Sequence, residues 1–345
     1  MKLVRTEDAV GQVLCHDITQ IIPGVVKDAV FRKGHIVTEE DIPVLLSVGK
    51  ENLYIWEKQE GMLHENEAAE ILRQICQGEH MHPSEVKEGK IELIADCEGV
   101  LKINTEKLNA VNNLGEMMIA SRHGNFPVKT GDKIAGTRII PLVIEEEKMQ
   151  KACEVAGKEP IFRILPYQKK KAGIVTTGSE VYYHRIEDKF TPVVIEKLKE
   201  CGVTEVKQIQ CNDDHEMIME AIQTLIEDGS DLIVCTGGMS VDPDDRTPLA
   251  IKNACMEVVT YGAPVLPGAM FMLAYCEKEG RQIPVMGLPG CVMYAKRTIF
   301  DLVLPRIMCD EKLHEKDFRL LGQGGLCLSC PVCTFPNCGF GKGGY

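Results

Sequence analysis

The sequence predicts an α/β protein whose main domain is a three-layer α/β/α arrangement around a mostly parallel sheet, at residues 170–308. Within that range, apolar runs of strand length alternate with amphipathic helical patterns. Such alternation favours a parallel sheet that is covered by helices on both faces. At 345 residues the chain also exceeds one ordinary hydrophobic core, so we expect smaller domains beside this one.

The N-terminal half predicts two smaller regions. Residues 1–57 are typical of a small β-rich domain, with a helix at 39–48 and a strand at 52–56. Residues 58–169 predict an α+β linking domain. Its expected helices are 65–77, 106–121 and 145–156, and its expected strands are 91–97, 100–103 and 137–143.

The main domain has the clearest rhythm of the chain. Its expected strands are 172–176, 205–210, 231–235 and 284–288, and its expected helices are 191–201, 215–228, 248–254 and 292–308. Residues 309–345 follow as a polar linker and a glycine- and cysteine-rich tail, which is too short to have a core of its own.

Composition excludes several classes of function. The formal charge of −12 disfavours a nucleic-acid surface, which needs clustered Lys and Arg. The sequence has no apolar run of the ~20 residues that a membrane helix needs, and no signal peptide is evident, so we expect a cytoplasmic protein without a membrane partner. Fifteen cysteines then indicate thiols, and the eleven scattered ones are interpreted as small buried hydrophobic side chains.

Three loops that follow expected strands carry the chemistry of a phosphate site. The first is Thr176-Thr177-Gly178-Ser179-Glu180, the second is Thr236-Gly237-Gly238-Met239-Ser240, and the third is Leu288-Pro289-Gly290. Glycine lets the backbone approach a phosphate, and ligands of parallel sheets lie beyond the carboxyl ends of the strands. Carboxylates after the second loop, Asp245 among them, indicate a divalent cation. Glycine-rich turns also arise from tight packing alone, but their occurrence after successive strands favours one shared site.

Five ordered motifs give this region a specific resemblance. They are GIVTTGSEV at 173–181, CNDDHEMIMEAI at 211–222, DLIVCTGGMSVDPDD at 231–245, LPGAM at 266–270 and GLPG at 287–290. In order and approximate spacing they resemble the MoaB/Mog-like molybdopterin-binding domain of molybdopterin molybdotransferases and adenylyltransferases. Competence-damage-type proteins share the TGGM-like loop and the Asp-Asp-Arg-Thr that follows it. Segments 8–18 and 31–55 resemble a shortened molybdotransferase N-terminal half that lacks its aspartate-containing insertion loop.

The resemblance implies roles for individual residues. The expected contacts to a pterin phosphate or nucleotide are Thr177, Gly178, Ser179 and Glu180, with Gly237, Gly238 and Ser240 as the second wall. Pro267, Gly268, Pro289 and Gly290 are expected to shape the pocket rim. The expected catalytic carboxylates, near Mg²⁺ or molybdate, are Glu180, Asp213 and Asp245. Ala269 and Cys291-Val292 depart from the lysine and Asn-Pro of the molybdotransferases, and 245–248 resembles the adenylyltransferase pattern.

The resemblance therefore implies a protein of molybdenum cofactor biosynthesis. It would bind molybdopterin or adenylylated molybdopterin and insert metal in the manner of a molybdotransferase with Mg²⁺. The alternatives are a non-catalytic carrier or sensor of the cofactor and an adenylyltransferase. Expected partners are the pterin phosphate, molybdate, a nucleotide and a client molybdoenzyme. Because members of the resembled family associate as dimers, the resemblance also implies a homodimer.

The tail carries a separate signal, the run Cys327-x2-Cys330-x2-Cys333-x4-Cys338. Four thiolates in twelve residues, with glycines and prolines that allow tight turns, can converge on one metal. The spacing is typical of an iron–sulfur cluster, and fused zinc knuckles give similar strings. A mobile tail with reactive thiols is the alternative without a metal.

Overall fold

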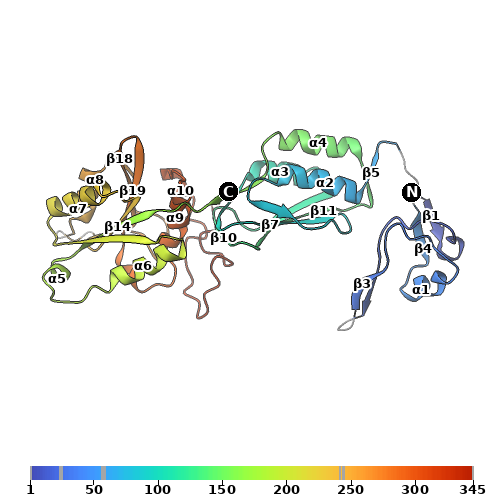
Figure 1. The fold of residues 1–345 in the computed structure, drawn as a ribbon, viewed down its shortest axis with the longest axis horizontal. Coiled ribbons are helices and arrows are strands. Elements are labelled where there is room, and N and C mark those ends of the chain that lie inside the picture. The colour runs from blue at the N-terminus through green and yellow to red at the C-terminus, as the bar shows by residue number, and fades with distance from the viewer. Residues whose placement is uncertain (1, 23–25, 56–59, 241, 243–244, 344–345) are drawn as a thin grey trace. The chain divides into compact units, whose positions relative to one another are not determined.

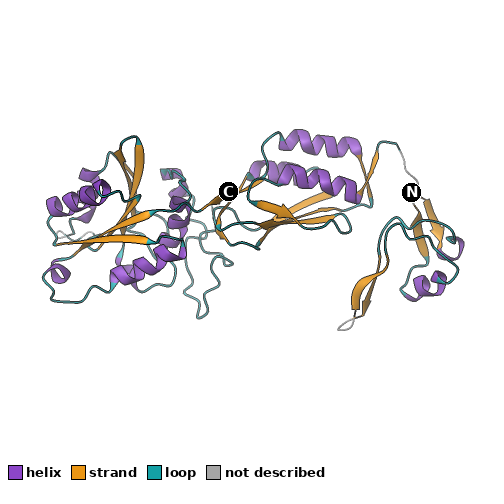
Figure 2. Ribbon diagram, viewed as in Figure 1, coloured by secondary structure: helices purple, strands orange, loops and turns teal. Residues whose placement is uncertain are grey.

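The computed structural model describes residues 2–22, 26–55, 60–240, 242 and 245–343. The chain divides into two units, each described by itself below (Figures 1 and 2). Unit 1 comprises residues 1–96, 103–122 and 130–163, and unit 2 comprises residues 97–102, 123–129 and 164–345.

Unit 1 begins with a small β-rich part. Its elements are β1 (Lys2–Arg5), η1 (Thr6–Asp8), β2 (Ile18–Ile22), β3 (Val26–Phe31), α1 (Asp41–Ser47) and β4 (Asn52–Ile55). Strands β1 and β4 pair antiparallel, and β2 and β3 form a hairpin. A core that includes Leu14, Ile18, Leu45 and Leu53 holds them together. The expected strand 52–56 is present to Ile55, and Trp56 lies outside the described residues.

The remainder of unit 1 is a sheet with helices on one face (Figure 1). The sheet has the order β6-β7-β11-β9 and is antiparallel throughout. Its strands are β6 (Met81–Pro83), β7 (Lys90–Ala95), β9 (Met117–Ser121) and β11 (Lys133–Ile139). The helices are α2 (Glu65–Cys76), α3 (Thr105–Asn112) and α4 (Glu146–Ala156), and β5 (Met62–His64) pairs with β12 (Val143–Glu145).

Two expectations for this region are wrong. The helix expected at 106–121 ends at Asn112, and 117–121 is strand β9 instead. Gly115 (φ 74°) and Glu116 (φ 59°) take left-handed backbone conformations, which end the helix. The Asn112 side chain then brackets Ile119, accepting its N–H at 2.8 Å and donating to its carbonyl at 3.0 Å. The strand expected at 137–143 lies four residues earlier, as β11.

Unit 2 is built on a six-stranded sheet of order β15-β14-β16-β19-β18-β17. The strands are β14 (Lys171–Thr177), β15 (Glu205–Cys211), β16 (Leu232–Thr236), β17 (Glu257–Tyr261), β18 (Met272–Lys278) and β19 (Arg281–Leu288). The four expected strands, β14, β15, β16 and β19, are parallel. The sequence interpretation missed β17 and β18, which add an antiparallel edge. Separately, β8 (Gly99–Ile103), β10 (Pro127–Val128) and β13 (Phe162–Pro166) form a three-stranded sheet.

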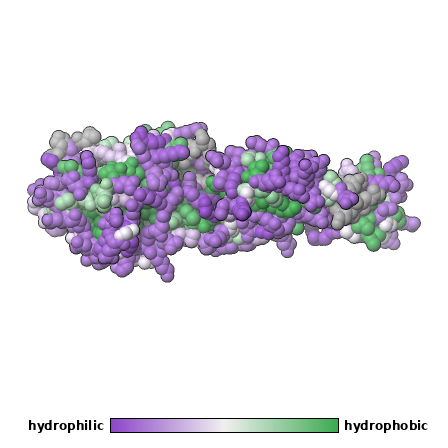
Figure 3. Space-filling view, turned by 90° about the horizontal axis from the view of Figure 1, so that it is seen from above, coloured by the Kyte–Doolittle hydropathy of each residue, from purple (hydrophilic) through white to green (hydrophobic). Residues whose placement is uncertain are grey.

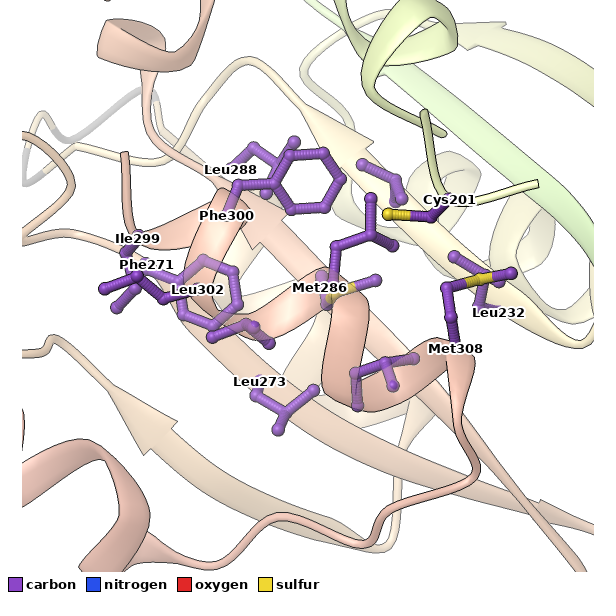
Figure 4. Packing of buried hydrophobic residues seen from close by; sticks show 14 of the residues in the cluster. Cys201, Leu232, Phe271, Leu273, Met286, Leu288, Ile299, Phe300, Leu302 and Met308 are labelled. Carbon is purple, nitrogen blue, oxygen red and sulfur yellow. The ribbon is translucent and has the colours of Figure 1, made fainter. Parts of the chain in front are cut away.

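Helices cover both faces of the large sheet, which confirms the three-layer α/β/α class. The helices are α5 (Ser179–Tyr182), α6 (Phe190–Glu200), α7 (His215–Glu227), α8 (Thr247–Ala254), α9 (Ile299–Met308) and α10 (Glu315–Arg319). Successive strand residues point to opposite faces, so Leu232 and Val234 pack with α6 and α9, and Ile233 and Cys235 pack with α7 and α8. Figure 4 shows the first of these cores, in which Phe300 lies close to Leu288.

Helix α9 begins later than expected. The sequence predicts a helix over 292–308, but 290–293 is the 3-10 turn η2 (Gly290–Met293) and α9 starts at Ile299. Thr298 and Asp301 form a capping box that fixes this start. Asp301 also accepts hydrogen bonds from the buried Lys197 at 2.7 Å and from Arg297 at 2.8 Å. The loop from Gly290 to Thr298 is thereby anchored at its end.

One cysteine pair differs from expectation. Cys255 and Cys276 form a disulfide with their Cα atoms 4.3 Å apart, whereas all scattered cysteines were expected to be free thiols. They lie close because Cys255 directly follows α8 and Cys276 lies on β18, which packs against that helix. Most of the remaining scattered cysteines are buried, as expected.

The outer surface is mainly hydrophilic on the face drawn in Figure 3, with apolar patches between polar side chains. Among the described residues, no helix has both the length and the apolar character that are needed to cross a membrane.

Candidate ligand site

The three expected loops start side by side at one edge of the unit 2 sheet. Thr176 of β14 pairs with Thr236 of β16, and Thr236 pairs with Leu288 of β19. Because these strands are parallel, their carboxyl ends lie together. The structure therefore brings the first, second and third loops to neighbouring positions, as the sequence predicts.

The first loop turns sharply at Gly178, whose φ is 130°. The next residue begins the four-residue helix α5, and the Ser179 N–H donates to Asp213 Oδ2 at 2.8 Å. Asp213 comes from the segment after β15, so its carboxylate ties the first loop to the adjacent strand end. Glu180 is exposed beside this turn.

The second loop is pressed against the first. Gly237 (φ 88°) lies so close that an added Cβ would be 2.4 Å from the Thr177 carbonyl oxygen. A Cβ on Gly238 (φ 55°) would be 2.7 Å from Thr247 Oγ1. The Thr177 hydroxyl donates to the Thr236 carbonyl at 3.1 Å and lies 3.1 Å from the Thr247 hydroxyl. Only glycine permits this approach, so the two loops form one locked unit.

Two of the three expected catalytic carboxylates, Asp213 and Asp245, accept a hydrogen bond from a loop amide. Asp213 accepts from the Ser179 amide, and Asp245 Oδ2 accepts from the Ser240 amide at 2.7 Å. Within the described part of the chain, no three His, Cys, Asp or Glu side chains are grouped so that they could hold a metal ion. Glu180, Asp213 and Asp245 therefore do not form a ready-made cation cage.

Thr236 is the polar group whose position points most directly to a ligand. It ends β16 directly before Gly237 and is 1% exposed. Its hydroxyl has no hydrogen-bond partner among the described residues. A buried hydroxyl without a partner costs about 1–3 kcal/mol, so such groups occur where a ligand or an ordered water completes them.

Sequence reasoning missed Tyr261, the last residue of β17. Its hydroxyl donates to the Met239 carbonyl in the second loop at 3.2 Å. Partial burial, together with the negative charge of Asp245, raises the pKa of Tyr261. No local pattern could reveal this residue, because it comes from one of the two strands that the sequence interpretation did not identify.

A second missed group lies beneath the first loop. The Thr176 hydroxyl lies 2.8 Å from the Thr191 hydroxyl of α6 and accepts from Gln208 Nε2 at 2.9 Å. Gln208 also donates to Asp188 at 3.0 Å. Although partial burial raises the pKa of Asp188, hydrogen bonds from Thr191, Phe190 and Gln208 lower it overall. This network fixes both ends of the segment that carries Glu180.

The expected rim residues lie at the same edge of the sheet but on its β18 and β19 side. Met272 pairs with Gly287, which places the loop before β18 beside the end of β19. Gly268 is buried, and an added Cβ would be 2.5 Å from Ile299 Cγ2, so its immediate role is close packing against α9. Pro289 is buried and Gly290 is exposed. Pro267 lines a cavity shared with the tail.

That cavity, of about 500 Å³, is lined by all four tail cysteines, Cys327, Cys330, Cys333 and Cys338. Cys330 and Cys333 are exposed, and the other two are half-buried. The structure therefore brings the four thiols around one space, without grouping any three as single-ion ligands in the described residues.

Comparison with known proteins assigns the domain that carries the loops. Residues 173–308 match the family model described as "Probable molybdopterin binding domain". Residues 173–308 are therefore a molybdopterin-binding-type domain. Residues 3–57 match a second family, described only as a domain of unknown function.

CinA-like proteins are among the curated relatives that match part of the chain. The match to that of Mycobacterium tuberculosis (strain H37Rv) is 35% identical over 85 residues, 25% of this chain and 20% of the relative. The match to that of Mycobacterium avium (strain 104) is 34% identical over 95 residues, 28% of this chain and 22% of the relative. The chain thus covers about a fifth of the length of these relatives.

Of three similar solved structures, two bear names from cofactor synthesis, and the third is described as of unknown function. The tungsten cofactor synthesizing protein MoaB of Pyrococcus furiosus is 23% identical with a TM-score of 0.32, over 36% of this chain and 84% of that chain. MoaB of Thermus thermophilus is 19% identical with a TM-score of 0.33, over 41% and 98%. CinA of Thermoplasma acidophilum is 15% identical with a TM-score of 0.33, over 41% and 98%.

Proposed function

We propose that this protein acts in molybdenum cofactor biosynthesis in the cytoplasm, where it binds molybdopterin or adenylylated molybdopterin at the glycine-loop edge of unit 2. The observation that carries the proposal is the close packing of the two glycine loops. Beside them lies the Thr236 hydroxyl, at the end of β16, which has no hydrogen-bond partner among the described residues. Backbone amides and hydroxyls at the ends of parallel strands are the donors that phosphate groups need. The match of residues 173–308 to a probable molybdopterin binding domain supports molybdopterin as the ligand.

The chemistry proposed at this edge is that of a molybdotransferase, with molybdate as substrate. Mg²⁺ is commonly bound through one or two carboxylates together with substrate phosphates. Glu180, Asp213 and Asp245 suit that arrangement, since they stand beside the loops without forming a cage of their own. The ion would supply charge neutralisation at the phosphates. The chain's own part is to fix the two loops through Gly237 and Thr177 and to hold the phosphate by amides and hydroxyls.

A non-catalytic carrier or sensor of the cofactor is the second candidate. Asp213 and Asp245 each already satisfy a loop amide, which is a structural role that needs no turnover. The third candidate is an adenylyltransferase, on the pattern Asp245-Arg246-Thr247-Pro248, of which Thr247 contacts Gly238. A homodimer and a client molybdoenzyme complete the proposal as partners.

The binding proposal is tested at Thr236. Thr236→Val removes an unpartnered hydroxyl, so stability should stay the same or rise by up to about 1–3 kcal/mol, whereas affinity for molybdopterin should fall by about tenfold. Thr236→Ser keeps the hydroxyl and is the matched control. Affinity is measured anaerobically by titration, and stability by urea unfolding. Unchanged affinity in Thr236→Val would show that molybdopterin does not bind at the Thr236 hydroxyl.

Turnover separates the candidates. Adenylylated molybdopterin and molybdate, incubated with the protein and Mg²⁺, should yield the metal-loaded cofactor if the protein is a molybdotransferase. Binding without turnover supports the carrier or sensor. Formation of adenylylated molybdopterin from molybdopterin and ATP supports the adenylyltransferase.

A further inference from the structure

The cysteine tail is a docked element of unit 2. The Leu266 N–H donates to the Gly325 carbonyl at 2.8 Å, and the Cys327 N–H donates back to the Leu266 carbonyl at 2.8 Å. At the other end, the buried Phe340 belongs to the core formed with α6 and α9. The cysteine run is therefore held at both ends against the loop that contains Pro267.

The loop between η2 and α9 forms the opposite wall of the cavity. Lys296 donates to the Pro331 carbonyl at 2.7 Å, and the Arg297 guanidinium lies 5.2 Å from the centre of the Phe335 ring. Both cationic residues line the cavity with Tyr294 and Phe335. Four bound thiolates would carry negative charge, which Lys296 would offset, whereas the Arg297 charge is already paired with Glu200 and Asp301.

The size of the cavity decides what kind of centre fits. A single zinc ion needs four sulfurs at about 2.3 Å, which places all sulfurs within about 4.6 Å of one another. All four thiols line one cavity of about 500 Å³, although no three of the described His, Cys, Asp or Glu side chains are already grouped as ligands of one metal ion. A polynuclear cluster, whose outer iron atoms reach separate thiolates, suits thiols spread around such a space.

We propose that Cys327, Cys330, Cys333 and Cys338 bind one [4Fe–4S] cluster in this cavity. The three-residue steps of the run, followed by a five-residue step, supply four thiolates from one short segment. On binding, each cysteine gives up its thiol proton to solvent and its sulfur coordinates one iron of the preassembled cluster. Lys296 and Arg297 both line the wall, and Lys296 stabilises the bound, negatively charged centre.

The cluster lies at the ligand-binding edge of the sheet. Pro267 precedes β18, which is three strands from β14 in the sheet order. At about 4.8 Å per strand this is on the order of 15 Å from the first glycine loop. The pterin site and the cluster are separate sites, so binding at one is measurable without the other.

The test is metal analysis of the full chain purified without oxygen. The expected result is a brown protein with about four iron and about four sulfide per chain. Each of the four Cys→Ser variants should lose most of the iron, whereas Cys153→Ser, an exposed cysteine of unit 1, should keep it. Urea unfolding of each variant confirms that unit 2 remains folded.

Three results would overturn the proposal. One is about one zinc per chain without iron. Another is protein that holds no iron after anaerobic purification and after incubation with iron and sulfide. The third is full iron content in Cys338→Ser, which would remove this residue as the fourth ligand.

Discussion

The close approach between the two glycine loops can be tested with a matched pair of glycines. Gly237 and Gly229 have the same φ, 88°, and both lie in unit 2. Around Gly229 an added Cβ meets nothing within 4 Å, whereas at Gly237 it would lie 2.4 Å from the Thr177 carbonyl oxygen and 2.8 Å from Thr177 Oγ1. Comparison of the two alanine variants therefore separates backbone strain from contact between the loops.

The magnitudes follow from these two costs. A left-handed φ with a Cβ costs about 1–2 kcal/mol, which both variants share. Overpacking at Gly237 adds about 1–3 kcal/mol, because the obstructing atom is backbone and cannot rotate away. We expect Gly229→Ala to lose about 1–2 kcal/mol of unfolding free energy and Gly237→Ala about 2–5 kcal/mol. Since the loop must shift, molybdopterin affinity should also fall by about tenfold or more in Gly237→Ala alone.

Urea unfolding followed by far-ultraviolet circular dichroism measures the loss of unfolding free energy in each variant. The two variants are comparable because both substitutions lie in unit 2. An anaerobic titration measures the molybdopterin affinity. Equal stability and equal affinity in the two variants would show that the loops are not held together through Gly237, and the reasoning for a shared site would fail with it.

Three further predictions concern the carboxylates and the assembly. Asp213→Ala should destabilise unit 2 by about 1–3 kcal/mol in urea, since the Ser179 amide loses its acceptor, and Asp213→Asn should restore most of this loss. The buried Arg306 holds the pKa of Glu311 below its ordinary value despite burial, so this pair stabilises the fold above about pH 4.5 and the contribution is lost as pH falls. Glu311→Gln should therefore flatten the acid dependence of stability, and Glu315→Gln, in an exposed pair, should not. Sedimentation at micromolar concentration should give a dimer mass, and a monomer mass would contradict the family-based expectation.

The sequence predicts the parallel part of the fold well because its signal is local. Strands β14, β16 and β19 contain apolar runs and β15 mixes polar and apolar residues, and the alternation of these strands with helical patterns indicates the topology. Strands β17 and β18 interrupt that alternation, and they form because they pair with β19 and with each other. Such pairing depends on partners that are distant in the sequence, which periodicity does not report.

The same distinction holds for the site. Gly237 and Gly238 were identified from the motif that follows an expected strand, although such glycines also arise from tight packing alone. Tyr261 and Gln208 were not, since each reaches the loops from a different strand and neither belongs to a motif. Residue types can indicate a loop's chemistry, whereas the side chains that hold the loop in place are set by the tertiary fold.

A sequence motif can place Asp213 and Asp245 beside the glycine loops without determining what each carboxylate does there. Asp213 and Asp245 lie beside the loops as expected, but each accepts a hydrogen bond from a loop amide that was expected to hold phosphate. A phosphate cannot take the Ser179 and Ser240 amides while both carboxylates occupy them, and the negative charges would repel it. A divalent cation held by Asp213 and Asp245 would offset these charges, which agrees with the proposal that phosphate binds together with a cation. Under this proposal, the two side chains that order the loops would also be the ones that hold the cation.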